Sequence, residues 1–142
     1  MITVDDCRVL DLPRIVMPQG SITPIEGGTH VPFDIARVFY LYDVPGGESR
    51  GGHAHRDLEQ VIVSVMGSFD VVVDDGLRRK TVTLNRSYYG LYLPSLIWRE
   101  LENFSSGAIC LVLCSQPYRE DEYFRDHVEF ISYRNSLAQP TS

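Results

Sequence analysis

The chain has 142 residues, of which 44% are hydrophobic and 23% charged, enough for one folded domain with a single sizeable core. Its formal net charge of -6 at pH 7 argues against broad nucleic-acid binding, although a local arginine cluster could still hold a small anion. No apolar run reaches the roughly 18 residues that span a bilayer, and the first residues do not resemble a secretion signal, so we expect a cytoplasmic protein without a membrane partner.

The N-terminal part predicts two short strands, at residues 7–12 and 20–26. These strands could pair with the rest of the domain or with a neighbouring subunit. Cys7 lies in the first of them, and Cys110 and Cys114 lie in a later strand at a separation of about 13 Å, too far to bridge. We therefore expect three reduced cysteines in the core.

The middle of the chain consists of short runs with the composition or alternation of β-strands. They lie at residues 37–43, 60–66, 69–73, 80–84, 90–94, 97–103 and 108–114. Between two of these runs, Asp74 to Leu77 is typical of a two-residue hairpin, because Gly76 tolerates a positive φ. Regularly spaced short strands predict an all-β sandwich or barrel.

The pattern changes from residue 119 onward. Tyr123, His127, Phe130 and Ile131 recur at helix-like offsets, which predicts a short helix within residues 119–137 that packs on the outside of the barrel. The tail at 139–142 is expected to be frayed.

His53 and His55 give the strongest chemical signal in the chain. Alternate residues of a strand face the same side, so the two imidazoles point into one space, where they could bind a metal or move protons. Taken alone, such a pair is as often a coincidence as a site. The surrounding residues therefore have to indicate whether the pair forms a site and, if so, whether that site binds a metal or transfers protons.

The spacing around the histidines is similar to that of the cupin superfamily, which consists of jelly-roll β-barrels. The positions that fit its first motif, Gly-x5-His-x-His-x3 or 4-Glu-x6-Gly, are Gly47, His53, His55 and Gly67. Gln60 replaces the metal-binding glutamate, and Arg99 stands where the second motif has its histidine. Two imidazoles, an amide and a guanidinium suit Zn²⁺ or Fe²⁺ poorly, so we predict a metal-free cupin whose histidines are available for acid–base chemistry.

A closer resemblance, to the WxcM-like sugar-nucleotide 3,4-ketoisomerases, extends over nearly the whole chain. It rests on residues 37–40, 50–55, 58–60, 74–76, 90–92, 98–100 and 123–130. The resemblance implies a cofactor-free enzyme that converts dTDP-4-keto-6-deoxyglucose into a 3-keto sugar through an enediol, in deoxysugar biosynthesis. It also implies one cupin domain over 1–142, with strands of 1–30 exchanged in a homodimer, a barrel at 31–118 and a helical segment at 119–137.

Site residues follow from the same resemblance, by position. The acid–base residues would be His53, His55 and Tyr40, with His55 favoured as the group beside the reacting carbons. The substrate-binding residues would be Arg37 and Arg50 at the diphosphate, Gln60 and Arg99 in the pocket, and Tyr92 or Trp98 stacked on thymine. A simpler interpretation exists for each residue type. The arginines could form surface ion pairs, the tyrosines could pack in the barrel, and Trp98 could belong to the core.

Two positions depart from the pattern expected for these ketoisomerases. Gln19 precedes Gly20 where we expect arginine, and Arg99 stands where some members carry histidine, which leaves the galacto or gluco product open. Two other classes remain: a metal-dependent cupin enzyme, and a non-catalytic cupin that binds nucleotide sugars. A sugar 3,5-epimerase shares the barrel class, but no motif in the chain supports it.

Overall fold

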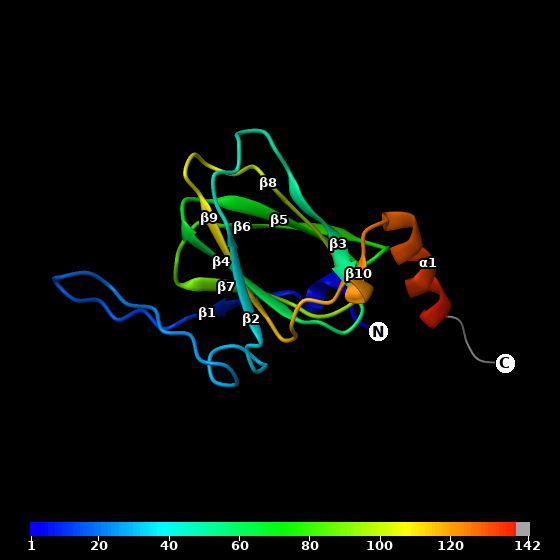
Figure 1. Ribbon diagram of the computed structural model, residues 1–142, viewed down its shortest axis with the longest axis horizontal. Coiled ribbons are helices and arrows are strands. Elements are labelled where there is room, and N and C mark those ends of the chain that lie inside the picture. The colour runs from blue at the N-terminus through cyan, green and yellow to red at the C-terminus, as the bar shows by residue number, and fades with distance from the viewer. Residues whose placement is uncertain (139–142) are drawn as a thin grey trace.

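Two five-stranded antiparallel sheets face each other and form a barrel, with one helix beside it, in the computed structural model, which describes residues 1–138 (Figure 1). The strands are β1 (Arg8–Asp11), β2 (Arg37–Leu41), β3 (Arg50–His55), β4 (Gln60–Met66), β5 (Phe69–Asp74), β6 (Arg79–Leu84), β7 (Tyr89–Leu93), β8 (Trp98–Glu102), β9 (Ile109–Cys114) and β10 (Tyr123–Phe124). The helix α1 spans His127–Ala138, and 3-10 turns cover Val4–Asp6 and Glu120–Glu122. The predicted jelly-roll class with a C-terminal helix is confirmed.

The strand order is β1-β7-β4-β9-β2 in one sheet and β10-β3-β8-β5-β6 in the other. The predicted strands between residues 37 and 114 are all present. The predicted hairpin joins β5 to β6: the Asp75 N–H donates to the Arg78 carbonyl at 3.2 Å, and Gly76 has a φ of +93°. Because consecutive strands lie in different sheets at several points, residues far apart in the sequence meet inside the barrel.

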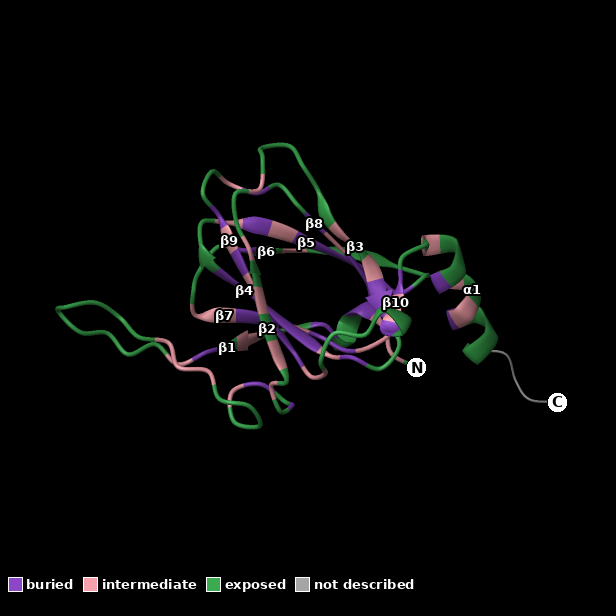
Figure 2. Cartoon of the chain, viewed as in Figure 1, coloured by how far each residue is buried: buried purple, intermediate pink, exposed green. Residues whose placement is uncertain are grey.

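The core lies between the sheets, where alternate strand residues point inward. Phe69 stacks on Phe104 with ring centroids 5.2 Å apart, and the side chains of β5 and β7 fill the space beside them. The three cysteines are buried and unpaired, as predicted. Figure 2 shows the buried residues concentrated in the strands and the exposed ones in the loops and on the outer side of α1.

The C-terminal segment differs from its prediction because α1 begins only at His127. Tyr123 and Phe124 instead pair with His55 and Ala54 of β3, and so close one edge of the sheet. The Asp126 carboxylate then accepts the N–H groups of Val128 and Glu129 at 2.8 and 3.2 Å, which starts the helix. The helical spacing of Tyr123 in the sequence is therefore coincidental.

The N-terminal segment also differs. The strand predicted at 7–12 is present as β1, but 20–26 forms no strand, and Ile15 and Ile22 make only an isolated bridge. The loop around that bridge extends away from the barrel between β1 and β2 (Figure 1). No helix within residues 1–138 is long and apolar enough to cross a membrane. The fraying expected at 139–142 concerns residues outside the described part of the chain.

Candidate active site

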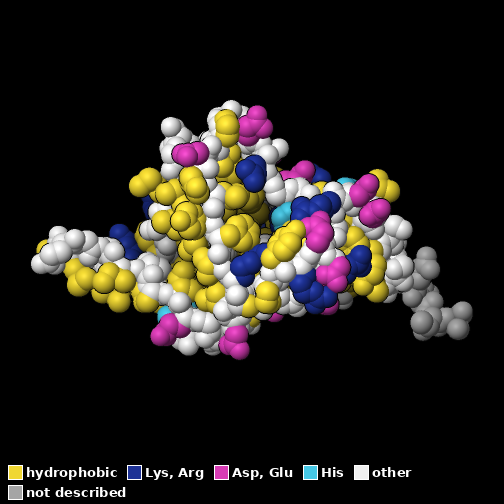
Figure 3. Space-filling view, viewed as in Figure 1, with side chains coloured by type: hydrophobic (Ala, Val, Ile, Leu, Met, Phe, Trp, Pro, Cys, Tyr) yellow, Lys and Arg dark blue, Asp and Glu magenta, His cyan; other side chains and the backbone are white. Residues whose placement is uncertain are grey.

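A cavity of about 220 Å³ opens between the two sheets, where Figure 3 shows the face of the molecule hollowed beside a histidine and several basic side chains. Its lining consists of Phe39, Leu41, Arg50, Gly51, His53, Gln60, Ile62, Arg99, Leu101, Val112, Tyr123 and Arg125. Apolar residues of β2, β4, β8 and β9 form the walls. The polar groups come from β3, β4, β8 and the β10 segment, so the cavity combines an apolar wall with convergent ionisable side chains.

The path of β3 places the histidine pair. A register shift between Arg50 and His53 and the positive φ of Gly51, +78°, turn the strand before both imidazoles point inward, with centroids 4.8 Å apart. His53 lines the cavity, whereas His55 is 0% exposed and lies behind it. Of the two imidazoles, His53 is therefore the one that borders the cavity, whereas the expected place of His55 beside the reacting carbons stays a prediction.

The strand β10 closes the other side of the pair. The Tyr123 ring lies 5.1 Å from the ring of His53 and 4.5 Å from that of His55. Just before it, the buried Glu122 carboxylate accepts the N–H groups of Asp57 and Leu58 at 2.5 and 2.7 Å. This contact fixes the loop after β3 against β10, and so holds the tyrosine and the histidines in register.

Arg99 carries a buried charge into the cavity wall, with an exposure of 1%. It donates to the Gln60 side-chain oxygen at 2.5 Å and to the Ile97 carbonyl at 3.0 Å, and no carboxylate pairs with it in the described part of the chain. Burial lowers its pKa to about 10, so it stays charged at neutral pH. An uncompensated guanidinium of this kind attracts an anion.

The same geometry does not fit the metal of a typical cupin. At the third and fourth ligand positions, the Gln60 oxygen is engaged by Arg99, and a guanidinium has no lone pair to offer a cation. Within residues 1–138, no three His, Cys, Asp or Glu side chains gather at one point.

Both histidines are neutral at pH 7. Burial and then the charge of Arg99 lower the pKa of His53 to about 3, and burial, Arg99 and His53 lower that of His55 still further. A neutral imidazole can accept a proton, which a cationic one cannot. The positive surroundings therefore preserve the basic form of His53 but oppose its protonation, unless an anion forms beside it.

Three further arginines surround the cavity. The Arg37 guanidinium donates to the Tyr123 hydroxyl at 3.2 Å and to the Cys114 sulfur at 3.5 Å. Arg50 lies at the exposed rim, and Arg125 is held by Glu120 through bonds of 2.6 and 2.9 Å. Together with Arg99 they make the opening basic, although the whole chain is acidic.

Three residues expected at the site lie elsewhere in this chain. Tyr40 is 60% exposed on the outer face of β2, with its ring 5.8 Å from that of Tyr42. Tyr92 donates to Glu59, outside the cavity. Trp98 is buried against α1, with its ring 5.0 Å from that of His127. Inward and outward positions alternate along a strand, so a shift of one residue moves a side chain out of the barrel.

Sequence reasoning missed Tyr123 and Arg125, both of which line the cavity. The sequence pattern places them in a helix, and a helix on the outside of the barrel supplies no pocket residues. The signal that could have found them is the resemblance over 123–130, which includes both. Cys114, predicted only as a core residue, also contacts the site through Arg37 and Gln60.

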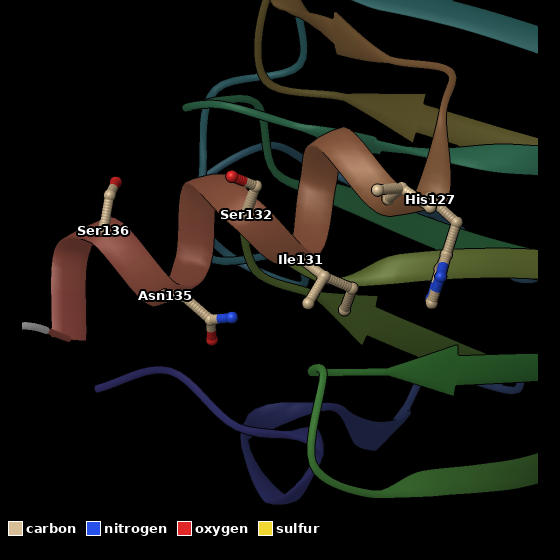
Figure 4. Close-up of a pocket in the computed structure, with 6 residues that line it drawn as sticks. His127, Ile131, Ser132, Asn135 and Ser136 are labelled. Carbon is tan, nitrogen blue, oxygen red and sulfur yellow. The ribbon is translucent and has the colours of Figure 1, made fainter.

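A second hollow, of about 510 Å³, runs along α1 (Figure 4). Its labelled side chains do not converge: Ser132 and Ser136 point to one side of the helix, whereas Ile131 and Asn135 point to the other. His127 is already paired with Asp74 at 2.9 Å. The barrel cavity is therefore the candidate active site.

A jelly-roll barrel with a histidine pair and a buried arginine at an internal cavity defines a cupin-type barrel. Residues 5–135 match the FdtA family, described as WxcM-like, C-terminal. The chain is 40% identical over 126 residues to a TDP-4-oxo-6-deoxy-alpha-D-glucose-3,4-oxoisomerase of Aneurinibacillus thermoaerophilus, covering 89% of this chain and 91% of the relative. The chain belongs to this WxcM-like family.

Solved structures agree. A 3,4-ketoisomerase from Helicobacter canadensis superposes with a TM-score of 0.89 at 41% identity, covering 92% of this chain and 98% of that one. A mutant of the 3,4-ketoisomerase QdtA from Thermoanaerobacterium thermosaccharolyticum, in complex with TDP-4-keto-6-deoxyglucose, has a TM-score of 0.91 at 33% identity, covering 94% and 97%. The fold is therefore shared with its family over almost the full chain.

Proposed function

We propose that the protein is a sugar-nucleotide 3,4-ketoisomerase that converts dTDP-4-keto-6-deoxyglucose into a dTDP-3-keto-6-deoxyhexose. The observation that carries this proposal is the neutral His53 imidazole beside the unpaired charge of Arg99, in a cavity whose volume suits a sugar ring. The relatives support the substrate, because one is named for TDP-4-oxo-6-deoxyglucose and another is solved with it.

The chemistry needs a base that serves two adjacent carbons. His53 removes the proton from C3, the electron pair forms the C3–C4 double bond, and negative charge develops on the C4 oxygen. The Arg99 guanidinium stabilises that charge. The enediolate in turn makes protonation of His53 favourable, because an opposite charge now lies beside the imidazole. Delivery of a proton from His53 to C4, together with transfer of the C3 hydroxyl proton to the C4 oxygen, completes the exchange. Since one carbon is oxidised as the other is reduced, no external oxidant is required.

The rest of the substrate extends out of the cavity. Arg50 at the rim provides a planar donor for a phosphate oxygen, and Arg37 donates to the hydroxyl of Tyr123, which lines the cavity. We assign these two arginines to the diphosphate side of the site. The three unpaired cysteines fit the reducing cytoplasm, where we place this step of deoxysugar biosynthesis.

The test is ¹H NMR of dTDP-4-keto-6-deoxyglucose mixed with chelator-treated protein in D₂O. We expect a 3-keto sugar labelled with deuterium at the migrating position, and its H4 couplings will identify the galacto or gluco product. An unchanged spectrum from protein that binds dTDP would replace the proposal with a nucleotide-sugar-binding module. Activity restored only by an added metal ion would replace it with a metal-dependent cupin.

We also propose that the protein works as a homodimer that exchanges its N-terminal segments. The loop between β1 and β2 leaves its own barrel, and it carries exposed apolar side chains at Ile15, Val16, Met17 and Ile22. Both β1 and β2 are edge strands of one sheet, and the outer face of β2 exposes Val38 and Tyr40. A second copy that lays its loop across this face covers both apolar surfaces.

Light scattering coupled to size-exclusion chromatography tests the dimer. The wild-type protein is expected at twice the mass of one chain, and the Val16→Arg/Ile22→Arg variant at a lower mass with unchanged circular dichroism. The matched control is Leu77→Arg, because Leu77 is an exposed apolar residue on the β5–β6 hairpin, which belongs to the other sheet. A monomeric wild-type protein would contradict the proposal.

A further inference from the structure

Tyr123 brings to the cavity a hydroxyl that can both donate and accept a proton, and the roles proposed for His53 and Arg99 leave this hydroxyl unused. It lines the cavity between the two histidines and Arg37, and the β10 pairing with His55 fixes its backbone. Its ring lies 5.1 Å from that of His53, so any sugar that reaches this imidazole also lies beside the phenol. A hydroxyl at this place is within reach of the sugar oxygens.

The hydrogen bonding of Tyr123 orients its proton. The Arg37 Nη2 atom donates to the phenol oxygen at 3.2 Å, and a guanidinium has donors only. The tyrosine must therefore act as the acceptor in that bond, and its own O–H is available to a different partner. Among residues 1–138, no side chain or carbonyl receives it. This hydroxyl is therefore free to donate a hydrogen bond to a sugar oxygen.

Ketoisomerisation moves two protons. One travels from C3 to C4 and needs a base beside the carbons. The other travels from the C3 hydroxyl to the C4 oxygen, and a single imidazole that already holds the carbon-derived proton cannot carry it at the same moment. A second group that can both give and take a proton is needed, within reach of two vicinal oxygens.

We propose that Tyr123 is a catalytic residue that carries the hydroxyl proton of the 3,4-ketoisomerase reaction, while His53 carries the carbon proton; this inference rests on the proposed function. As His53 breaks the C3–H bond and the carbonyl pair moves to the C4 oxygen, that oxygen takes the phenol proton. The phenolate, which Arg37 stabilises, then removes the C3 hydroxyl proton. The released pair forms the C3 carbonyl, the C3–C4 π pair takes the proton of His53 at C4, and both side chains return to their starting states.

The residues around Tyr123 serve this role without touching the sugar. The Glu122 carboxylate holds the loop at Asp57 and Leu58, so β10 cannot slide along β3. Arg37 is held in turn by the Cys114 sulfur at 3.5 Å. We regard Glu122 as a positioning residue, because it acts on the site through the backbone alone.

The experiment compares Tyr123→Phe with wild-type protein and with Tyr133→Phe. The first substitution keeps the aromatic ring and its contacts to both histidines, and Tyr133 is a matched control because its ring packs on Phe124, 5.0 Å away, outside the cavity. In Tyr123→Phe we expect turnover to fall by at least about 100-fold, the low end for a general acid or base. The dissociation constant for TDP should change by less than about threefold, and Tyr133→Phe should match wild type in both respects.

A second readout separates catalysis from structure. In D₂O, Tyr123→Phe should place deuterium at C3 of recovered substrate at least about tenfold more often per product formed than wild type, because His53 still removes the carbon proton but the hydroxyl proton transfer stalls. Turnover close to wild type would overturn the role of Tyr123. So would an equal fall of exchange and product formation together with weakened TDP binding, which would indicate mere misplacement of the sugar. A wild-type protein that forms no 3-keto sugar would overturn the proposed function, and this role with it.

Discussion

Arg99 and Arg134 are both buried in this protein, and their surroundings are opposite. Arg134, on α1, donates to the carbonyls of Leu96 and Ile2 at 2.7 and 2.6 Å and ties the helix to the β7–β8 turn and the N-terminus. Arg99, in the barrel, leaves its Nε atom without a partner in the described chain. The first arginine is satisfied by the fold, whereas the second is not.

The same contrast holds for the histidines. His127 of the α1 region is paired with Asp74 at 2.9 Å, whereas buried ring nitrogens of His53 and His55 find no partner among residues 1–138. In that part of the chain, every buried side-chain nitrogen or oxygen without a hydrogen bond lies in or beside the barrel cavity: those of Arg37, His53, His55 and Arg99. Since such atoms cost stability, they mark where the fold gives up stability for a ligand.

The largest effect that we expect from this contrast is a difference in turnover between variants of His53 and His127. His53→Asn removes the proposed base and should lower turnover by about 100-fold or more, with TDP binding and thermal stability close to wild type. His127→Asn removes a hydrogen-bond partner of Asp74 and should leave turnover unchanged while it lowers the melting temperature. Turnover and thermal denaturation of the two variants, measured side by side, check this. Equal turnover losses in the two variants would show that catalysis is not confined to the barrel cavity.

The two arginines should differ in the same sense. Arg134→Met removes two charge-assisted hydrogen bonds and leaves two carbonyls unpaired, so the free energy of unfolding should fall by about 3 kcal/mol. Arg99→Met also leaves two acceptors without a donor, the Gln60 oxygen and the Ile97 carbonyl, but it removes a buried charge that no carboxylate pairs. We therefore expect a smaller loss of stability than for Arg134→Met. Arg99→Met should nevertheless lower turnover by about 100-fold, as the loss of a donor to a developing oxyanion does. Urea denaturation and steady-state kinetics of both variants provide the comparison, and a stability loss for Arg99→Met as large as that for Arg134→Met would contradict it.

The sequence predicts the barrel well because its signals are local. Alternation and turn residues define β4 and the β5–β6 hairpin within a few positions, and the motif spacing brings His53, Gln60 and Arg99 together. Each of these residues lies on a strand, and the neighbouring residues indicate which of its side chains point inward. The substitution at Arg99 further indicates a site without a metal, because a guanidinium cannot be a ligand.

The missed features depend on contacts between distant segments. Tyr123 has a helical spacing in the sequence, but strand pairing with β3 overrides it. Residues 20–26 have strand composition, but no strand within residues 1–138 lies beside them. The resemblance assigns Tyr40 and Trp98 to the site by position alone and does not say whether their side chains point into the barrel or out of it. In the structure both side chains lie outside the cavity. Local composition cannot supply this information.

The histidine pair should also make stability depend on pH. An unfolded histidine takes up a proton near pH 6.5, whereas the pKa of His53 is lowered to about 3, so between these values the unfolded chain binds more protons and stability falls as the pH is lowered. The slope should reach up to about 1 kcal/mol per pH unit for each histidine. Urea denaturation at pH 7, 6 and 5 measures it, and the His53→Asn/His55→Asn variant should show a clearly flatter dependence. An unchanged slope would mean that these rings are not held neutral by the fold.

Substitution of Asp74 is expected to give the smallest effect. It tests the region around α1, where buried polar groups have hydrogen-bond partners within the fold. Burial raises its pKa, but hydrogen bonds from the Gly76 N–H, His127 and Arg79 outweigh burial, so the pKa lies below its ordinary value. A carboxyl with a lowered pKa stabilises the fold above its unfolded pKa, and this contribution is lost as the pH falls through the folded value. Asp74→Asn should therefore be less stable than wild type at pH 7, and the difference should shrink as the pH is lowered below about 4. Turnover should not change, because Asp74 contacts α1 and not the cavity. A fall in turnover would show that the docking of α1, through the Trp98 and His127 rings, affects the position of Arg99 on the same strand.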